Sequence, residues 1–320
     1  MSNKTKLNYI LYHGNCYDGL CSAFSFLLYY KRKNLILPTC IPLYHNYEFK
    51  RDLNMFKDKN IAILDFSLDK ELLEKLLKIT KSIQLIDHHI KSQDLIPYLS
   101  DSKLTDSIID VSNTKAGCEL CWNYLFPTCK IPYFLECVSK RDIWKENDDT
   151  KKINSYLHTL SFKTPEEVLN FYLEEYKNTD EVLNKYREIG SILLKDVQKK
   201  IENSLKHVTT AVFTVVSKDS EKKKSYIVGM SNCDTNLRSE VGNSICELVD
   251  DKDNYLYDFG VIYNYNFEKD EFWLSFRGMD GRENKENVDL NYICKNLGGG
   301  GHACSSGATV KNMNDHFKRI

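Results

Sequence analysis

The chain has 320 residues, 42% of them hydrophobic, which is long enough for two domains of ordinary size with a packed core in each. Its 44 basic and 45 acidic side chains nearly cancel, so it lacks the overall positive charge with which proteins grip long nucleic acid. No run of about 18 apolar residues predicts a membrane span, and the first residues lack a secretory pattern. We therefore expect a globular cytoplasmic protein without membrane association.

The eleven cysteines are scattered mostly singly through apolar segments, which is typical of reduced core thiols rather than of a disulfide framework. Cys118 and Cys121 form one C-x-x-C pair, but no second pair completes a zinc site. We expect both thiols in the core of a helix.

The first expected strand, residues 7–12, runs into a glycine-containing loop, residues 13–19, and then into an apolar helix over residues 20–30. A loop of this kind at a helix N-terminus offers backbone N–H groups to anions or metal-bound phosphates. His13 and Asp18 bracket it. Two interpretations stay open: both are functional ligands, or Asp18 caps the helix and His13 is a hydrogen-bonded strand-end residue.

A second strand is expected near residues 35–43, and a third apolar strand from residue 60 ends in Asp65. The following helix is expected over residues 69–81, because its leucines recur with helical spacing. The first and third strands thus each end in a side chain of a metal-ligating type, followed by a helix.

The next strand begins at residue 82 and ends in Asp87, His88 and His89. Polar groups at the end of a buried strand need partners, which a metal or a phosphate would supply. In the alternative interpretation, Asp87 caps the next helix and the two histidines are solvated. Because open parallel sheets bind ligands at the carboxyl ends of their strands, we expect a site at this edge.

Residues 113–177 are expected to be mainly helical. Helices are predicted from residues 113–117, over residues 132–144, and from the cap, proline and acidic first turn of residues 164–167. Asp142 lies in the second of them and is a candidate ligand, although an aspartate on a helix is commonly solvated or paired with a base.

A long charged helix over residues 180–205 suits a connector between domains. We predict a catalytic domain over residues 1–180, a connector over residues 181–207 and a substrate domain over residues 208–320.

Beyond the connector the pattern changes to strands. Residues 209–216 and 225–230 are expected to pair around a solvated basic turn at residues 222–224. The remaining expected elements are a helix over residues 236–249, an aromatic-rich hairpin over residues 258–267 and 271–277, and a last helix over residues 290–297.

Four glycines, residues 298–301, run directly into His302. Backbone amides free of side-chain crowding can form an anion-binding nest, and His302 can donate to a phosphate oxygen. A flexible loop is the alternative.

These motifs occur in one order: residues 13–19, Asp65, residues 87–89, Asp142 and residues 298–302. The ordered set, which spans residues 7–309, resembles the DHH phosphoesterase superfamily. More narrowly it resembles members with the DHH-associated C-terminal domain, such as oligoribonucleases and phosphoadenosine-phosphate phosphatases. The resemblance implies an α/β fold in which an N-terminal parallel-sheet DHH domain is joined by a long helix to a smaller α/β substrate domain.

The resemblance also implies a metal-dependent hydrolase of phosphodiesters or phosphoanhydrides, usually with two manganese ions, magnesium being the alternative. The metal ligands that it implies are His13, Asp18, Asp65, His88 and Asp142. It implies catalytic roles for Asp65, which would bridge the metals, for His89, which would contact the scissile phosphate, and for Asp87, which would orient His88. The substrate-binding residues that it implies are Arg277, Gly299, Gly300, Gly301 and His302.

One position departs from the pattern. Many relatives have a second carboxylate two residues before the aspartate that matches Asp18, and this chain has Cys16 there. The thiol could ligate a metal as a thiolate, or one metal position could be weak or empty. One or two metals therefore both stay open.

We expect this chain to hydrolyse phosphodiester bonds of short oligonucleotides or small nucleotides by metal-activated water in a cleft between the domains. The near-neutral charge favours short substrates over long duplexes. Four hairpin aromatics could stack on bases or simply pack across the strands, namely Tyr263, Tyr265, Phe272 and Trp273. The alternatives are a phosphoanhydride hydrolase and a catalytically weak nucleotide-binding regulator, and a homodimer is left open.

Overall fold

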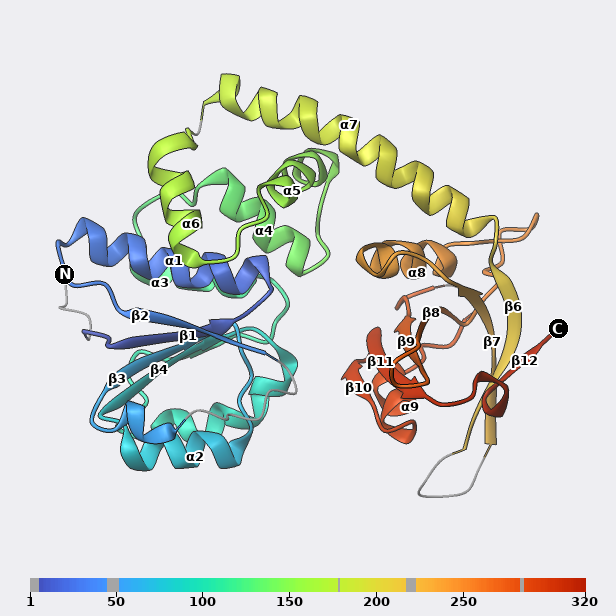
Figure 1. Ribbon diagram of the computed structural model, residues 1–320, viewed down its shortest axis with the longest axis horizontal. Helices are drawn as coiled ribbons and strands as arrows, with labels where there is room; N and C mark the ends of the chain where they lie inside the picture. The colour runs from blue at the N-terminus through green and yellow to red at the C-terminus, as the bar shows by residue number, and fades with distance from the viewer. Residues whose placement is uncertain (1–5, 45–51, 178, 217–222, 283–284) are drawn as a thin grey trace. The chain divides into compact units, whose positions relative to one another are not determined.

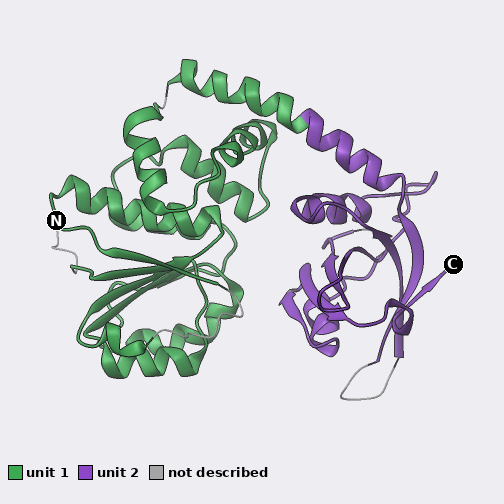
Figure 2. Cartoon of the chain, viewed as in Figure 1, with its two compact units in different colours: residues 1–194 green, residues 195–320 purple. Residues whose placement is uncertain are grey.

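The computed structural model describes residues 6–44, 52–177, 179–216, 223–282 and 285–320. The chain forms two compact units, Met1–Leu194 and Lys195–Ile320 (Figure 2). No helix among the described residues is both long enough and apolar enough to cross a membrane.

Unit 1 is built on a five-stranded sheet in the order β2-β1-β3-β4-β5. All neighbouring strands pair in parallel, so their carboxyl ends share one edge. The strands are β1 (Tyr9–His13), β2 (Thr39–Leu43), β3 (Asn60–Leu64), β4 (Ser82–Asp87) and the short β5 (Ile108–Ile109). The four strands expected from the sequence are confirmed, the second of them only over its last five residues.

Helices cover both faces of this sheet (Figure 1). The helices of unit 1 are α1 (Tyr17–Arg32), α2 (Lys70–Ile79), α3 (Gly117–Leu125), α4 (Tyr133–Asp142), α5 (Asp148–Leu160) and α6 (Pro165–Asn170). Short segments η1 (Leu53–Phe56), η2 (Ile90–Ser100) and the π-helical turn η3 (Phe171–Glu175) connect them. The leucines of α2 pack on one face, while α1 and α3 cover the other. Coverage on both sides explains why β4 is buried along its whole length.

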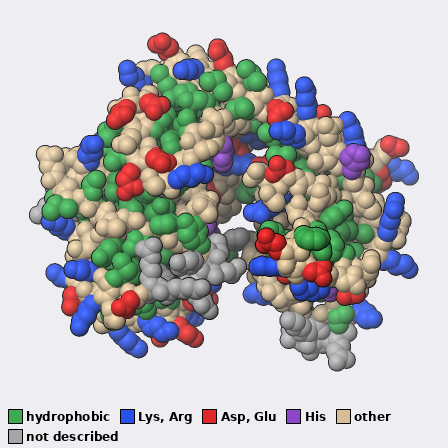
Figure 3. All heavy atoms as spheres, in the orientation of Figure 1, with side chains coloured by type: hydrophobic (Ala, Val, Ile, Leu, Met, Phe, Trp, Pro, Cys, Tyr) green, Lys and Arg blue, Asp and Glu red, His purple; other side chains and the backbone are tan. Residues whose placement is uncertain are grey.

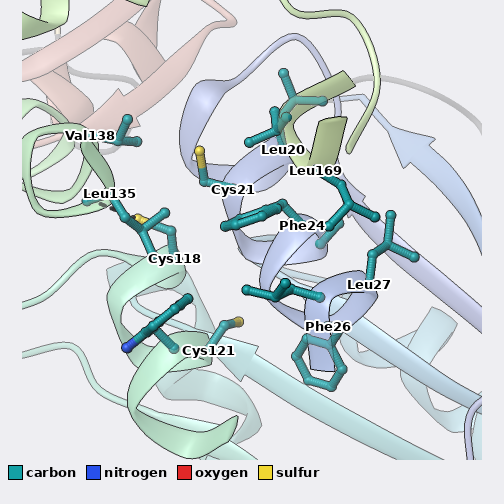
Figure 4. Packing of buried hydrophobic residues seen from close by; sticks show 14 of the residues in the cluster. Leu20, Cys21, Phe24, Phe26, Leu27, Cys118, Cys121, Leu135, Val138 and Leu169 are labelled. Atoms are coloured by element: carbon teal, nitrogen blue, oxygen red, sulfur yellow. Dashed lines mark hydrogen bonds between the residues drawn. The ribbon is translucent and has the colours of Figure 1, made fainter. Parts of the chain in front are cut away.

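The core above the sheet lies where α1, α3 and α4 meet (Figure 4). Phe24 of α1 lies among side chains of the other two helices, and Cys118 Sγ donates to the carbonyl of Leu135 over 3.8 Å. Cys118 and Cys121 are both fully buried free thiols, which confirms the expectation that this C-x-x-C pair is helix core. This packing fixes the positions of α1, α3 and α4 relative to the sheet edge.

The predicted helix start at residues 164–167 is confirmed: the Thr164 side chain accepts from the Glu167 N–H, and Pro165 opens α6. The long helix α7 (Asp180–Leu205) has the bounds expected from the sequence. The boundary between the two units falls inside α7, and the division of the chain at residues 180 and 207 stays a prediction.

Unit 2 contains a seven-stranded mixed sheet in the order β10-β11-β9-β8-β7-β6-β12. Its strands are β6 (Thr209–Val216), β7 (Lys223–Ser231), β8 (Phe259–Asn266), β9 (Glu271–Arg277), β10 (Gly300–His302), β11 (Ser305–Val310) and β12 (Phe317–Arg319). Only β7 and β8 pair in parallel among these described strands. The aromatic hairpin expected from the sequence is confirmed as β8 and β9.

Helices α8 (Arg238–Cys246) and α9 (Leu290–Asn296) cover opposite faces of this sheet, and η4 (Thr235–Leu237) and η5 (Met313–Asp315) are short turns. Successive side chains of β8 point to opposite faces of the sheet, which explains why both faces are covered. Val261 packs in the hydrophobic cluster with α9, and the next residue, Ile262, packs with α8. The predicted architecture, a parallel-sheet unit followed by a smaller α/β unit, is confirmed.

The predicted basic turn at residues 222–224 is wrong in part. Lys223 and Lys224 belong to β7, where they pair with Val216 and Val215, and Lys222 lies outside the described residues. The Lys224 ammonium lies over the ring of Tyr226, at 5.3 Å from its centroid, on the same face of the strand. On the face that Figure 3 shows, basic and acidic side chains are interspersed, as the near-neutral composition suggests.

Candidate metal centre

The carboxyl ends of three neighbouring strands of unit 1 carry the residues of the centre. His13 ends β1, Asp65 directly follows β3, and Asp87 ends β4. The parallel register places these strand ends side by side, with Leu64 opposite both Tyr12 and Ile86. His88 and His89 leave β4 at the same edge. The structure thus brings together the strand-end residues that the sequence nominated, and their role as a site stays a prediction.

Asp65 lies at the middle of the cluster and is almost completely buried, at 1% exposed. Its backbone is left-handed (φ 55°), a conformation that aspartate tolerates better than most residues, and its N–H donates to the carbonyl of Ile86. The carboxylate faces imidazoles on two sides: Oδ2 is 3.4 Å from His13 Nδ1, and Oδ1 is 3.2 Å from His88 Nε2. Neither oxygen accepts a hydrogen bond of good geometry from the described residues.

Two further carboxylates reach His88 from helices. Asp18, in the first turn of α1, places Oδ2 3.5 Å from His88 Nε2, and Asp142, the last residue of α4, places Oδ2 3.2 Å from the same nitrogen. The Asp18 carboxylate also accepts hydrogen bonds from the backbone N–H groups of Gly117 and Cys118, both over 2.8 Å. These N–H groups belong to the first residues of α3. Asp18 therefore pairs with unpaired donors at the N-terminus of a second helix, where the helix dipole favours a negative charge.

Asp87 orients His89 rather than His88, which corrects the role implied by the family resemblance. Asp87 Oδ1 is 2.7 Å from His89 Nδ1, whereas it meets His88 only through the backbone N–H of that residue. In an extended chain, residues two apart point to the same side and consecutive residues point to opposite sides. Asp87 and His89 therefore share a side.

Two serines hold the other oxygen of Asp87. Ser67 Oγ donates to Oδ2 over 2.9 Å, Ser92 Oγ donates to the same oxygen, and the two hydroxyl oxygens lie 2.9 Å from each other. Neither serine belonged to the predicted site. Each lies in a loop or turn a few residues beyond a strand end, without a distinctive pattern, so only the folded structure reveals them.

The charges of the cluster are strongly coupled. Burial raises the pKa of Asp18 well above its usual value, and repulsion from Asp65 and Asp142 adds to the shift. Burial also acts to raise the pKa of Asp65, but contacts with His13 and His88 outweigh it and hold the pKa low. Burial acts to lower the pKa of His88, yet Asp142 and Asp65 raise it to about 11. The cluster thus crowds three carboxylates around shared cationic groups.

The pair of Asp87 and His89 shows the same compensation. Burial acts to lower the pKa of His89, but the hydrogen bond to Asp87 and the charge of Asp65 raise it to about 9. Burial acts to raise the pKa of Asp87, and the hydrogen bond with His89 brings it below its usual value. At neutral pH this arrangement holds a proton on the His89 imidazole.

Cys16, the N-cap residue of α1, belongs to the same cluster. Its Sγ, a His13 ring nitrogen and an Asp65 oxygen all lie within 4.8 Å of one another. Burial and the nearby carboxylates of Asp65 and Asp142 raise the pKa of the thiol well above its usual value. The residue that departs from the family pattern is therefore at hand as a ligand, and without a cation the surroundings keep it protonated.

The donor set fits a divalent cation. Groups of ligand atoms within 4.8 Å of one another are His13, Cys16 and Asp65; Asp65, His88 and His89; and Asp18, His88 and Asp142. Asp65 and His88 are each shared by two groups, and the buried oxygens of Asp65 have no hydrogen-bond donor in the described part of the chain. Mixed carboxylate and imidazole ligands suit manganese, and carboxylate oxygens suit magnesium.

The predicted substrate residues lie in unit 2. Arg277 ends β9 and is buried, at 9% exposed; Nη1 donates to the Phe276 carbonyl and Nη2 to Ser239 Oγ, while Nε has no acceptor among the described residues. Burial and the nearby Arg238 lower its pKa from the usual value. The guanidinium thus has hydrogen-bonding capacity that these neighbours do not use.

The glycine stretch does not form the predicted anion nest. The N–H groups of Gly298 and Gly299 donate to carbonyls of α9, and that of Gly301 donates to Asn291 Oδ1. Residues Gly300–His302 form β10, which pairs with β11. A Cβ at Gly299 would meet the Gly307 carbonyl at 2.0 Å, so close chain packing explains a glycine there. The side chain of His302 lies outside the described part of the structure.

Comparisons with known proteins give a fold and one distant relative. No family model matches the chain. An uncharacterized protein of Acanthamoeba polyphaga mimivirus is 28% identical, covering 97% of this chain and 69% of that protein. The solved structure of a pGpG-specific phosphodiesterase from Vibrio cholerae superposes on 96% of this chain and over 94% of the length of that protein. The sequence identity is 12% and the TM-score is 0.46.

The solved DHH domain of a protein assigned to a family of ribosomal proteins superposes on 98% of this chain and over 83% of the length of that domain. The sequence identity is 16% and the TM-score is 0.53. At such low identity the likeness concerns the fold, and the narrower resemblance to oligoribonucleases and phosphoadenosine-phosphate phosphatases stays a prediction. The chain therefore shares the fold of that DHH domain.

Proposed function

We propose that this chain is a metal-dependent phosphoesterase that hydrolyses phosphodiester bonds of short oligonucleotides or small nucleotides. The observation that carries the proposal is the buried Asp65 carboxylate, which lies among imidazoles and carboxylates without a hydrogen bond from the described residues. A negative charge buried in this way needs a cation, and a shared carboxylate is suited to hold two.

In this proposal the metals are manganese, with magnesium as the alternative. One would be held by His13, Asp65 and the Cys16 thiolate, and the other by Asp18, His88 and Asp142, with Asp65 between them. Bound divalent cations supply Lewis-acid activation of water and of the phosphoryl oxygens.

The residues of the chain itself position the reaction. Asp87 fixes the orientation of the His89 ring through the 2.7 Å contact at Nδ1, and the same contact favours the protonated form of the ring. A protonated imidazole beside the cluster gives a charge-assisted hydrogen bond to a phosphate oxygen as negative charge develops there. Gly117 and Cys118 hold Asp18 through their N–H groups, which keeps this ligand in place before any cation binds.

For unit 2 we propose that Arg277 contributes to substrate binding. A buried guanidinium with an Nε–H that lacks an acceptor among the described residues is suited to a phosphate or another anionic group. Because the amides of Gly299 and Gly301 are engaged within the unit, the glycines would act through close packing and not as anion donors.

The experiment is hydrolysis of a substrate panel in the presence of manganese. The panel contains a dinucleotide, a longer oligonucleotide, phosphoadenosine phosphate, a cyclic dinucleotide and tripolyphosphate. Asp65→Asn removes the central charge while keeping a residue type that tolerates left-handed backbone. Asp58→Asn is its matched control, because Asp58 is exposed and also left-handed (φ 58°).

We expect release of mononucleotides by the wild type and by Asp58→Asn, and loss of release by Asp65→Asn. Phosphate release from tripolyphosphate alone would replace the proposal by a phosphoanhydride hydrolase. Nucleotide binding without any hydrolysis would replace it by a regulatory protein.

A further inference from the structure

Trp144 stands in an unusual conformation two residues after a member of the metal cluster. Helix α4 ends at Asp142, Ile143 turns into the core, and Trp144 adopts left-handed backbone with φ 57°. Chain reversals of this kind at helix ends favour glycine or asparagine, and a bulky residue there is a strained exception. Folding alone would therefore select a different residue at this position.

Burial does not compensate for this strain, because Trp144 is 54% exposed. Its contact with Arg141 is a cation-π arrangement, with the guanidinium carbon 4.9 Å from the ring centroid. Such contacts contribute little at exposed sites. The N–H groups of Trp144 and Lys145 donate to the carbonyls of Arg141 and Lys140, which explains the chain reversal but not the choice of an indole at this position. Strained residues cluster at functional sites, so the position of Trp144 relative to the cluster matters.

The backbone of Trp144 lies close to the cluster. Asp142 Oδ2 is 3.2 Å from His88 Nε2, and residues two apart in sequence have Cα atoms within roughly 7 Å of each other. The segment is tethered on both sides of Trp144: Lys145 Nζ donates to the Asn113 carbonyl over 2.6 Å, and Arg141 pairs with Glu146 at 3.0 Å. The indole and the guanidinium are therefore held as a preformed stack.

We propose that Trp144 is a base-stacking residue, and that the substrate of the metal centre carries a nucleobase next to the scissile phosphate. This inference rests on the proposed phosphoesterase function and deepens it by naming a residue that would recognise the base of the substrate. An aromatic face supported from behind by arginine recognises the π-face of any base, so it favours nucleotides over polyphosphate without selecting one sequence.

The aromatic hairpin of unit 2 is a weaker candidate for the same role. Tyr265 packs on Phe272 with ring centroids 4.9 Å apart, and its hydroxyl donates to Asp270. Trp273 is 47% exposed and donates to Glu271 from its own strand. These rings have cross-strand or same-strand partners in ordinary strand geometry, which supplies a structural reason for them. Trp273 therefore serves as the control tryptophan.

The test compares a dinucleotide with the same dinucleotide lacking one base, in the presence of manganese. We expect Trp144→Ala to raise KM for the intact dinucleotide on the order of 10- to 100-fold, with a smaller change in kcat. The abasic substrate should be equally poor for the wild type and the variant. Trp144→Phe should restore part of the affinity, and Trp273→Ala should behave as wild type.

Stability gives a second readout that a merely structural role would not produce. Trp144→Gly relieves the left-handed strain, so it should melt at or above the wild-type temperature while binding the intact dinucleotide as weakly as Trp144→Ala. Trp144→Gly that melts well below wild type would assign the indole a structural role. Equal KM increases for intact and abasic substrates would mean that Trp144 contacts something other than a base. Either result overturns the inference.

The failure of hydrolysis is separable from the failure of stacking. Adenosine monophosphate binding is followed by quenching of tryptophan fluorescence in a Trp273→Phe background, where the other remaining tryptophan, Trp122, is buried. Quenching that disappears in Trp144→Ala, without hydrolysis of any substrate, supports the stacking role and contradicts the proposed activity. Hydrolysis that is insensitive to both the base and Trp144 supports the activity and contradicts the stacking role.

Discussion

Gly117 gives the sharpest test of how the centre is held, because it fits between two of the aspartates. A Cβ at this position would lie 2.9 Å from Asp65 Cβ and 3.0 Å from Asp18 Oδ2. Carbon atoms in favourable contact stand about 3.5–4.0 Å apart, so Gly117→Ala creates an overlap of roughly 0.6 Å or more with Asp65. Neither aspartate can yield freely, since the Asp65 N–H bonds the Ile86 carbonyl and Asp18 accepts the Gly117 N–H.

The magnitude follows from two opposing effects. Overpacking costs about 1–3 kcal/mol, and replacing glycine by alanine in a helix returns at most about 1 kcal/mol, so the net free energy of unfolding should fall by about 1–2 kcal/mol. Displacement of two ligands by about half an ångström should weaken manganese binding on the order of 10- to 100-fold. Calorimetric titration with manganese and thermal unfolding measure the two effects separately.

Gly300→Ala is the matched control, because among the described residues its Cβ would meet only Asn291 Oδ1, at 3.7 Å. This variant should bind manganese as the wild type does. If Gly117→Ala also binds manganese with unchanged affinity while remaining folded, the close packing around Gly117 does not hold Asp18 and Asp65 in place as ligands.

Three further changes have expected outcomes. Asp87→Asn should lower kcat for phosphodiester hydrolysis on the order of 10- to 100-fold without changing manganese affinity; a parallel loss of metal would make Asp87 a ligand instead. Cys16→Asp should abolish the ultraviolet charge-transfer band that a thiolate–cadmium bond produces in the wild type, and no such band in the wild type would exclude Cys16 from the ligands. Arg282 donates to four backbone carbonyls, so Arg282→Met should destabilise unit 2 by roughly 3 kcal/mol in guanidinium denaturation, and a loss below about 1 kcal/mol would contradict this.

The sequence predicts the sheet edge of the site well because that information is local. An apolar run ending in a polar residue marks the ends of β1, β3 and β4, and the parallel geometry then brings His13, Asp65 and Asp87 together. Only the ordered motif set, compared with a family, nominated Asp142, because one aspartate on a helix has no distinguishing pattern. The structure places it 3.2 Å from His88.

Long-range contacts escaped prediction. The N–H groups that hold Asp18 come from Gly117 and Cys118, 99 and 100 residues away, and no local spacing connects them. The pairing of Asp87 with His89 was within reach of sequence reasoning, because alternation along an extended chain puts residues two apart on one side. The prediction of an anion nest at the glycine stretch was wrong because glycine allows close chain packing as well as anion binding. Only the register of β10 with β11 shows that close packing is the reason here.

The three most deeply buried aspartates of the centre differ in how the fold compensates their charge, and this difference identifies where a cation acts. Asp18 has two backbone N–H donors, and Asp87 has two serines and an imidazole, whereas Asp65 has only imidazoles at 3.2 to 3.6 Å without hydrogen-bond geometry among the described residues. Asp65 therefore relies on the positive charge of its neighbouring imidazoles, which holds its pKa low in the metal-free protein, and a cation bound there would take over that role.

Asp65→Asn should therefore melt below the wild type in a chelator, because the contacts that hold the Asp65 pKa low are lost. Manganese at 100 times its Kd should stabilise the wild type by about 2.7 kcal/mol and leave Asp65→Asn nearly unchanged, so that the gap between the two melting temperatures widens when the metal is added. If Asp65→Asn melts at or above the wild type in the chelator, the neighbouring histidines do not balance the Asp65 charge. Manganese that stabilises both proteins equally would exclude Asp65 from the ligands.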